Sequence, residues 1–281
     1  MRVAFRSVTV EVGGWRACDD VTVDVPERSM TVLVGANGAG KSTLLRCLYR
    51  ALRPTAGMVA VDDDDVWSLP GPAAGRRVAA VVQEPDAGFD LTVAELVGLG
   101  RIPHRHGWQR LTSADHDIVD QAIERVGLGG FEHRHVATLS GGERQRANIA
   151  RAVAQQADVL VLDEPTNHLD VRHQLEILEL VTSLGVTVIA ALHDLVLAER
   201  YADQVLLLSE GQLLDHGPPL STITADNIHR MMGVHVRFVP DPLTGRRALH
   251  FELTSPTNTQ DGRDLSARTG RVDGKDVAPC A

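Results

Sequence analysis

A buried apolar run that enters a glycine-rich loop is the feature that most constrains the fold of this chain. The run Thr31–Val34 leads into GANGAGKST, residues 35–43, and an apolar-rich helical segment from Ser42 to about Leu52 follows. The loop fits the pattern G-x-x-x-x-G-K-[ST], which surrounds phosphate oxygens with backbone N–H groups when it joins a strand to a helix. The sequence therefore predicts a phosphate-binding strand–loop–helix unit.

The lysine of this loop also points to phosphate. Lys41 is one of only two lysines in the chain, and the other, Lys275, lies in a polar tail. An ammonium group on a flexible stem fits here as a point charge, whereas the planar guanidinium of arginine is bulkier. We expect Lys41 to reach the β- and γ-phosphates of a nucleotide and the Ser42 hydroxyl to bind Mg²⁺. The predicted nucleotide-binding residues of the loop are Gly35, Ala36, Asn37, Gly38, Ala39, Gly40, Lys41, Ser42 and Thr43.

The order of strand and helix signals predicts an α/β fold. The first 25 residues alternate apolar and polar side chains around a Gly13-Gly14 turn, which is typical of antiparallel strands. Beyond them, helical segments alternate with short apolar runs at 58–61, 78–82, 159–162, 186–191 and 205–208. Such alternation indicates a mostly parallel sheet. We therefore expect a P-loop core with a mostly parallel sheet, an N-terminal antiparallel β-subdomain and an inserted helical subdomain.

The domain boundaries follow from the same pattern. The stretch from 84 to about 155 shows no strand signal, and Thr92–Glu95 fits a capping box that would begin a helix there. Residues 234–239 and 246–252 predict a small C-terminal hairpin. The polar segment 254–281 has no aromatic residue, which favours a disordered tail. We expect residues 1–253 to form one nucleotide-binding domain with a helical subdomain at about 84–155.

Composition limits the partners that charge alone can recruit. The formal net charge of −9 argues against unspecific binding to nucleic acids or to an anionic membrane. Cys18, Cys47 and Cys280 are an odd, widely spaced set, which favours a reducing cytoplasm over a disulfide framework or a zinc cluster. The N-terminal residues lack the apolar core of a signal peptide, and no apolar run reaches the length of a membrane span. We expect any membrane association to pass through a partner.

An acidic pair follows the apolar run 159–162. Asp163 could hold Mg²⁺ through its water shell, and Glu164 beside it could polarise an attacking water. Acidic residues are common at strand ends, so this pair alone is a weak signal. Its occurrence together with the phosphate loop favours a catalytic role.

Between these two sites lies LSGGERQR, residues 139–146, and here the chain resembles the ATP-binding subunits of ABC transporters. LSGG is similar to the signature motif of that family, and other motifs follow the family's order over roughly residues 1–250. These are Gln83 as the Q-loop glutamine, Asp163 and Glu164 as the Walker B pair, residues 166–170 with Asp170 as the D-loop, and His193 as the switch histidine.

The resemblance implies an ATPase that uses ATP and Mg²⁺ and works as a head-to-tail pair of identical chains. In such a pair the signature residues of one chain close over the ATP of the other; here these are Leu139, Ser140, Gly141, Gly142 and Glu143. The implied catalytic residues are Glu164, which positions water, His193, which contacts the γ-phosphate, Gln83 and Lys41. Ser42, Gln83 and Asp163 are the implied metal ligands.

One position departs from the family pattern. The family usually stacks an aromatic side chain on adenine, but the matching residue here is Val12, and the nearest ring is Trp15. Either Trp15 takes over the stacking, or adenine rests on an aliphatic surface.

The amino-acid sequences of several segments resemble those of the ABC branch that imports chelated iron, heme and cobalamin. These segments are DLTVAELVGLGRIPHR (90–105), TNHLD (166–170), ALHDL (191–195) and GVHVRFVPDPLTGRR (233–247). The resemblance implies iron–siderophore import, with heme, cobalamin or another cargo as alternatives. It also implies transmembrane permease partners, an indirect substrate-binding protein, and a place at the inner face of the membrane. We expect Glu84–Arg105, with exposed Phe89, Leu91 and Ile102, to face the permease.

Three rival functions remain to be weighed. ABC-type ATPases that act on nucleic acids carry coiled coils, zinc cysteines or two fused copies, and this acidic chain has none of them, so we expect no nucleic-acid partner. A P-loop kinase would leave LSGG and His193 unexplained. An exporter subunit stays open, since the chain's own chemistry does not fix the direction of transport.

Overall fold

The computed structural model describes residues 1–82, 90–105, 107, 109–167, 169–240, 242 and 247–253. The predicted site residue Gln83, the predicted contact Phe89 and the tail 254–281 lie outside the described residues. Within the described ranges, no helix combines the length and the apolar character that a membrane crossing requires.

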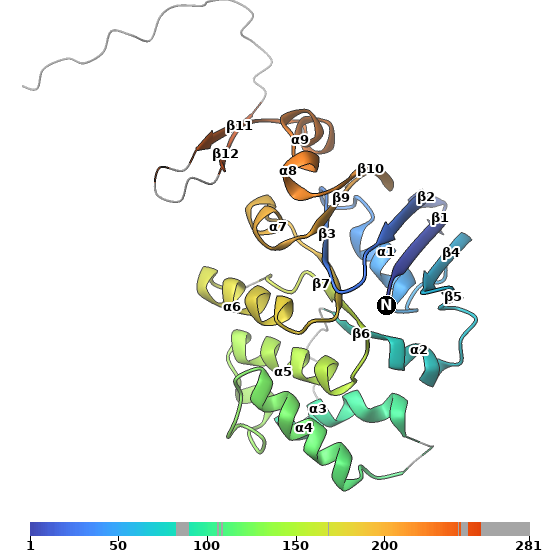
Figure 1. Cartoon of the computed structure of the whole chain (residues 1–281), viewed down its shortest axis with the longest axis vertical. Helices are drawn as coiled ribbons and strands as arrows, with labels where there is room; N and C mark the ends of the chain where they lie inside the picture. The colour runs from blue at the N-terminus through green and yellow to red at the C-terminus, as the bar shows by residue number, and fades with distance from the viewer. Residues whose placement is uncertain are drawn as a thin grey trace, which may run out of the picture.

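A four-stranded antiparallel sheet forms the N-terminal part, at the right of Figure 1 beside α1 (Lys41–Leu48). Its strands are β1 (Val3–Val12), β2 (Trp15–Val25), β4 (Ala56–Val61) and β5 (Asp64–Asp65), in the order β2-β1-β4-β5. Gly13 and Gly14 join β1 to β2 with φ angles of 58° and 81°, which suits a two-residue hairpin turn. The antiparallel strands predicted in the first 25 residues are thus confirmed. The run 58–61, which was expected among the strands of the mostly parallel sheet, instead belongs to β4 and pairs antiparallel with β1.

A six-stranded sheet forms the centre of the molecule, in the order β10-β9-β3-β8-β7-β6. All neighbours are parallel except β9 and β10. The strands are β3 (Met30–Val34), β6 (Val78–Val81), β7 (Val159–Asp163), β8 (Thr187–Ala191), β9 (Gln204–Ser209) and β10 (Gln212–Gly217). β3 and β8 are buried along their whole length, which explains their continuous apolar sequences.

Helices flank this sheet, and some differ from the prediction. The flanking helices are α1, α2 (Gly71–Arg77), α6 (Val171–Thr182) and α7 (Leu195–Tyr201). α1 ends at Leu48 rather than at about Leu52, because Arg50 has a left-handed φ of 64° that an α-helix cannot accommodate. α2 was not predicted, since its sequence GPAAGRR carries no apolar periodicity.

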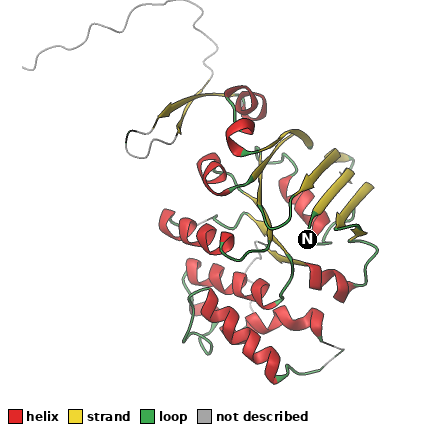
Figure 2. Cartoon of the chain, in the orientation of Figure 1, coloured by secondary structure: helices red, strands yellow, loops and turns green. Residues whose placement is uncertain are grey.

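A helical region between β6 and β7 occupies the lower part of the molecule, where Figure 2 shows helices without strands. It contains α3 (Val93–Gly98), η1 (Leu99–His104), α4 (Ser113–Arg125), η2 (Val136–Thr138) and α5 (Gly141–Ala154). The capping box predicted at Thr92 and Glu95 is confirmed, and similar boxes begin α4 and α5. These caps define where the helices start in a region of modest hydrophobicity.

A buried ion pair ties the helices of this region together. Arg101 of η1 donates to Asp115 of α4 at 2.9 Å, to the carbonyl of Ala154 at 2.8 Å and to the Gln156 side chain at 2.9 Å. The pKa of Asp115 lies well below its ordinary value of 3.8, because the Thr112 backbone N–H, the Thr112 hydroxyl and then Arg101 stabilise the carboxylate. The contribution of Asp115 to stability is therefore present above pH 3.8 and is lost as the pH falls below it.

We expect Arg101→Ala to lower the free energy of unfolding by about 3 kcal/mol, because it leaves a buried carboxylate without its cation. Urea unfolding at pH 7 measures this change, and Arg110→Ala, at an exposed arginine of the same region, is the matched control. A loss of less than about 1 kcal/mol would mean that the pair is solvated like a surface ion pair.

The C-terminal part begins with α8 (Pro219–Thr222) and α9 (Ala225–Met232) and ends with the antiparallel hairpin β11 (Val234–Pro240) and β12 (Arg247–Leu253). The hairpin lies beyond α8 and α9 in Figure 1 and confirms the predicted one. Arg247 fastens it to the body, since Nε contacts both carboxylate oxygens of Glu199 at 2.9 Å. The same guanidinium lies 4.3 Å from the centre of the Phe238 ring.

Candidate functional site

The loop between β3 and α1 wraps the start of the helix. Gly40 caps α1 with a φ of 100°, a conformation that side chains disfavour. A Cβ atom at this residue would lie 2.4 Å from the carbonyl oxygen of Ala17, so β2 approaches the loop too closely for any side chain. Glycine is therefore required here for two independent reasons, and the loop presents its backbone N–H groups at a helix N-terminus.

Lys41 is folded back onto this loop. Its Nζ donates to the carbonyl oxygens of Gly35 at 2.8 Å and Ala36 at 3.1 Å, and the residue is only 5% exposed. Burial lowers the pKa of Lys41, whereas the carboxylates of Glu164 and Asp163 raise it. The ammonium group is thus held inside the loop, near the positions that phosphate oxygens would take.

Ser42 and Asp163 meet although 121 residues separate them in the sequence. The Ser42 hydroxyl, in the first turn of α1, donates to Asp163 Oδ1 at 2.7 Å, at the carboxyl end of β7. A hydroxyl and a carboxylate oxygen are hard donors of the kind that Mg²⁺ prefers. The donor set therefore fits a magnesium ion beside the loop.

Glu164 and His193 form a second pair next to this one. Parallel pairing of β7 with β8 sets Asp163 opposite Ala191, so the residues that follow both strands come together. His193 Nε2 lies 2.5 Å from Glu164 Oε1, and the Asn167 amide donates to the other carboxylate oxygen. Glu164 also has a left-handed φ of 54°, a strained conformation that is concentrated at functional sites. The sequence analysis placed Asn167 in the predicted D-loop but did not predict its contact with Glu164.

The signature residues lie in a different part of the molecule. α5 belongs to the lower helical region of Figure 1, whereas α1 lies at the upper right. Ser140 caps α5, where its hydroxyl accepts from the Glu143 backbone at 3.3 Å and its own N–H donates to the Glu143 carboxylate at 2.7 Å. Leu139 and Gly142 are buried, but Ser140 and Gly141 are exposed. An exposed helix N-terminus is free to meet an anion brought by another molecule.

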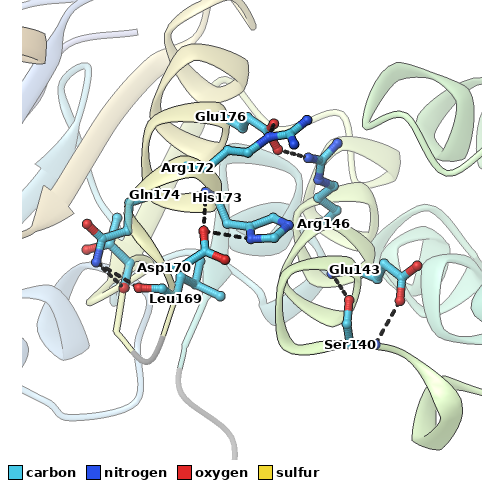
Figure 3. A network of polar contacts seen from close by, with 10 residues as sticks. Ser140, Glu143, Arg146, Leu169, Asp170, Arg172, His173, Gln174 and Glu176 are labelled. Atoms are coloured by element: carbon cyan, nitrogen blue, oxygen red, sulfur yellow. Dashed lines mark hydrogen bonds and ion pairs between the residues drawn. The ribbon is translucent and has the colours of Figure 1, made fainter. Parts of the chain in front are cut away.

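Asp170, the last residue of the predicted D-loop, caps α6 next to the signature (Figure 3). Its Oδ1 accepts from the His173 backbone N–H at 2.9 Å and lies 2.9 Å from Nδ1 of the same residue. These bonds to His173 hold the pKa of Asp170 below its ordinary range.

A pocket of about 810 Å³ borders the phosphate loop. Its loop side is formed by residues 36–39, and Trp15, which is 69% exposed, forms part of its wall. Val12, the register partner of Trp15, is 52% exposed and does not line the pocket. The remaining lining residues are Arg16, Ser209, Glu210, Arg230 and Met231. Sequence reasoning missed all five. Arg16 follows Trp15 on β2, and the other four reach the loop only through the pairing of β9 with β3 and the return of α9.

Comparison with known proteins agrees with this arrangement. Residues 18–167 match the sequence model of the ABC transporter family. The cobalamin import ATP-binding protein BtuD of Halobacterium salinarum is 44% identical over 251 residues, which cover 87% of this chain and 62% of that protein. The chain thus spans less than two thirds of that relative's length. The ferric enterobactin transport ATP-binding protein FepC of Escherichia coli is 37% identical, covering 87% of this chain and 92% of FepC.

The fold agrees as well. A solved dimeric structure of a bacterial ABC transporter cassette superposes with a TM-score of 0.68 at 25% identity, covering 77% of this chain and 98% of that one. The predicted fold class, with its mostly parallel sheet and its antiparallel N-terminal β-subdomain, is confirmed. By its motifs, its fold and its relatives, the chain belongs to the ABC transporter family, as one of its ATP-binding cassettes.

Proposed function

We propose that this protein is the ATP-hydrolysing subunit of an ABC importer. The observation that carries the proposal is the pair of contacts Ser42–Asp163 and Glu164–His193, which gathers a metal-binding oxygen set and a candidate base at the edge of one phosphate loop. A binding protein without catalysis would not need the second contact. Residues 1–253 would act as one nucleotide-binding domain, with the helical subdomain at about 84–155.

The reaction follows from the positions of these side chains. ATP occupies the loop with its γ-phosphate near the end of β7, and Glu164 accepts a proton from the water that attacks the γ-phosphorus. The bond between the γ-phosphorus and the oxygen that bridges it to the β-phosphate breaks, and ADP leaves with that oxygen. Lys41 neutralises phosphate charge. His193 exchanges its contact with Glu164 for one with the γ-phosphate, so that the base becomes free when substrate is present.

Ser42 and Asp163, together with Gln83, are the residues that would hold Mg²⁺. When bound, the ion would neutralise charge on the phosphate oxygens. Trp15 would stack on adenine in the pocket beside the loop, since its large ring forms part of the pocket wall and is 69% exposed.

We further propose that two copies pair head to tail. Ser140 and Gly141 are exposed at the N-terminus of α5, in a part of the molecule remote from the loop that would need them. In a head-to-tail pair each signature completes the partner's ATP site, so ATP closes the dimer and its hydrolysis opens it. The dimeric solved cassette supports this arrangement.

A permease would dock on the described part of the predicted segment 84–105, in which Leu91 is half-buried rather than exposed as expected. Leu99 and Ile102 of η1 are 42% and 55% exposed, while Arg101 between them is buried and paired. An exposed apolar pair on a firmly anchored turn suits a protein contact. The protein would thus work at the inner face of the cell membrane through this permease, without a nucleic-acid partner.

For the cargo we propose iron–siderophore complexes, in line with the relative named for ferric enterobactin transport and with the sequence segments that resemble the chelated-iron branch. Cobalamin is the second candidate, because the relative with the higher identity is named for cobalamin import. The cargo would reach the permease through a substrate-binding protein.

The test is ATPase stimulation in a reconstituted complex of this chain with its permease. We expect phosphate release to rise when the binding protein carries a ferric siderophore, and to rise less with cobalamin. The same complex with Glu164→Gln is the blank. Stimulation by cobalamin alone would reverse the order of the two cargoes, and no ATPase activity in any complex would contradict the proposed function.

A further inference from the structure

The side chain of His173 in the same chain fills the space beside Gly142, the second glycine of the signature. Gly142 is buried, and a Cβ atom there would lie 2.7 Å from Cδ2, 3.1 Å from Cγ and 3.2 Å from Nε2 of His173. Contacts this short force a neighbour to move. As long as the ring of His173, on the first turn of α6, stays in this position, only glycine fits at this point of α5.

His173 is held in this position by the D-loop. Its Nδ1 lies 2.9 Å from the Asp170 carboxylate, so the ring edge that carries Cδ2 and Nε2 is directed at Gly142. Figure 3 shows the ring pointing from α6 toward α5, with Asp170 on its other side. One imidazole thus touches both the helix that carries the signature and the residue that ends the D-loop.

Two further contacts run parallel to this one. A Cβ atom at Gly141 would lie 3.9 Å from Leu169 Cδ2, which is ordinary packing distance. One turn later, Arg146 of α5 pairs with Glu176 of α6, which also accepts from Arg172 Nε at 2.8 Å. The Arg146 and Glu176 side chains are 26% and 31% exposed, so this pair is partly solvated and contributes little by itself.

We propose that His173 is a positioning residue that fixes the signature helix to the D-loop of the same chain, so that both segments approach the partner's nucleotide as one rigid unit. The inference rests on the proposed head-to-tail dimer and deepens it. If the two segments were free to move separately, ATP would have to order each of them on closure. A preformed link removes that cost, and its loss weakens closure without touching the loop that binds ATP.

The contact of His173 has two parts, the bond of Nδ1 to Asp170 and the ring edge that meets Gly142, and two substitutions distinguish them. His173→Ala removes both the ring and its side-chain bond to Asp170, while the backbone bond to Asp170 stays. His173→Asn keeps an N–H donor for Asp170 but removes the ring edge that meets Gly142. His116→Ala, the same change at an exposed residue of α4, is the matched control.

The experiment uses the full chain carrying Glu164→Gln, with ATP and Mg²⁺ as the probe. Sedimentation gives the dimer dissociation constant, and titration gives the ATP affinity of the monomer. We expect His173→Ala to weaken the ATP-bound dimer by roughly tenfold or more, a typical coupling between sites, with monomer ATP affinity unchanged. His173→Asn should fall between it and the parent, and His116→Ala should match the parent.

A second-site test addresses the reason for the glycine. Gly142→Ala should weaken the dimer because its methyl group meets the His173 ring and displaces it. The double variant with His173→Ala should then be no weaker than the weaker of the two single variants, because both changes break the same contact. If the methyl group instead obstructed the partner's phosphate, the two losses would add. Dimerisation of His173→Ala at the parental level, or additive losses in the double variant, would overturn the inference.

A readout in the monomer keeps this result apart from the proposed function. Hydrogen exchange at the amides of residues 141–146 should be faster in His173→Ala than in the parent, because α5 loses its contact with α6. A parent that binds no ATP, or that binds it without dimerising, would contradict the proposed function. Unchanged exchange in the His173→Ala monomer would overturn the inference whatever the parent does.

Discussion

Replacing Glu164 with glutamine is expected to reduce ATP hydrolysis roughly a hundredfold or more, the usual contribution of a general base. Glutamine is isosteric but accepts no proton from water. It keeps an oxygen for the Asn167 amide and retains a polar group near His193, so the site should stay assembled. ATP binding should therefore persist, and the ATP-bound dimer should accumulate because its opening depends on hydrolysis. Phosphate release and sedimentation with ATP measure the two effects.

A matched control for this change is Glu27→Gln, at a glutamate whose side chain is 72% exposed and which precedes the amino end of β3, whereas the loop follows its carboxyl end. It should hydrolyse ATP like the parent. Hydrolysis by Glu164→Gln at the parental rate would show that another group activates the water. Hydrolysis that falls while the dimer fails to accumulate would separate the base from the closure mechanism.

Replacing Lys41 with alanine is expected to weaken ATP binding by roughly tenfold to a hundredfold, since it removes charge-assisted bonds to the phosphates. Lys41→Arg should fail as well. The side chain is 5% exposed and folded against the carbonyls of Gly35 and Ala36, and this space admits an ammonium group but not a planar guanidinium. Titration with ATP and Mg²⁺ measures both variants.

The second lysine provides the control for that prediction. Lys275→Ala should bind ATP like the parent, and ATP should protect Lys41 but not Lys275 from an amine-reactive label. Burial lowers the pKa of Lys41, so its ammonium group loses its proton at a lower pH than that of an ordinary lysine. As the pH rises, ATP affinity should therefore begin to fall earlier than it would with an ordinary lysine. Equal binding by Lys41→Arg and the parent would mean that the loop opens enough for a guanidinium.

Local sequence patterns predicted most of the elements in this fold. Alternation predicted β1 and β2, and continuous apolar runs predicted β3 and β8, because burial on one face or on two leaves different patterns. Two features of the helices, α2 and the early end of α1, were not predicted. The sequence of α2 has no apolar face from which a helix could be predicted. α1 ends early because Arg50 is left-handed, a conformation that its residue type does not predict.

The candidate site divides in the same way. The glycine loop and the acidic pair were found because each motif is contiguous and its chemistry is specific. The contact of His193 with Glu164 needs the parallel pairing of β7 with β8, and Arg230 reaches the pocket only because α9 returns beside the loop. No local pattern encodes these meetings.

By itself the sequence determined which chemistry the chain can perform: a lysine and a serine in a glycine loop, a glutamate after an aspartate that ends a buried strand, and the signature LSGG. The tertiary structure alone decided which of these groups meet. It joined Ser42 to Asp163 and turned the ring of His173 onto Gly142, while it left Ser140 exposed. The physical reason is that side-chain patterns report how each segment is buried, whereas strand order and helix packing determine what it is buried against.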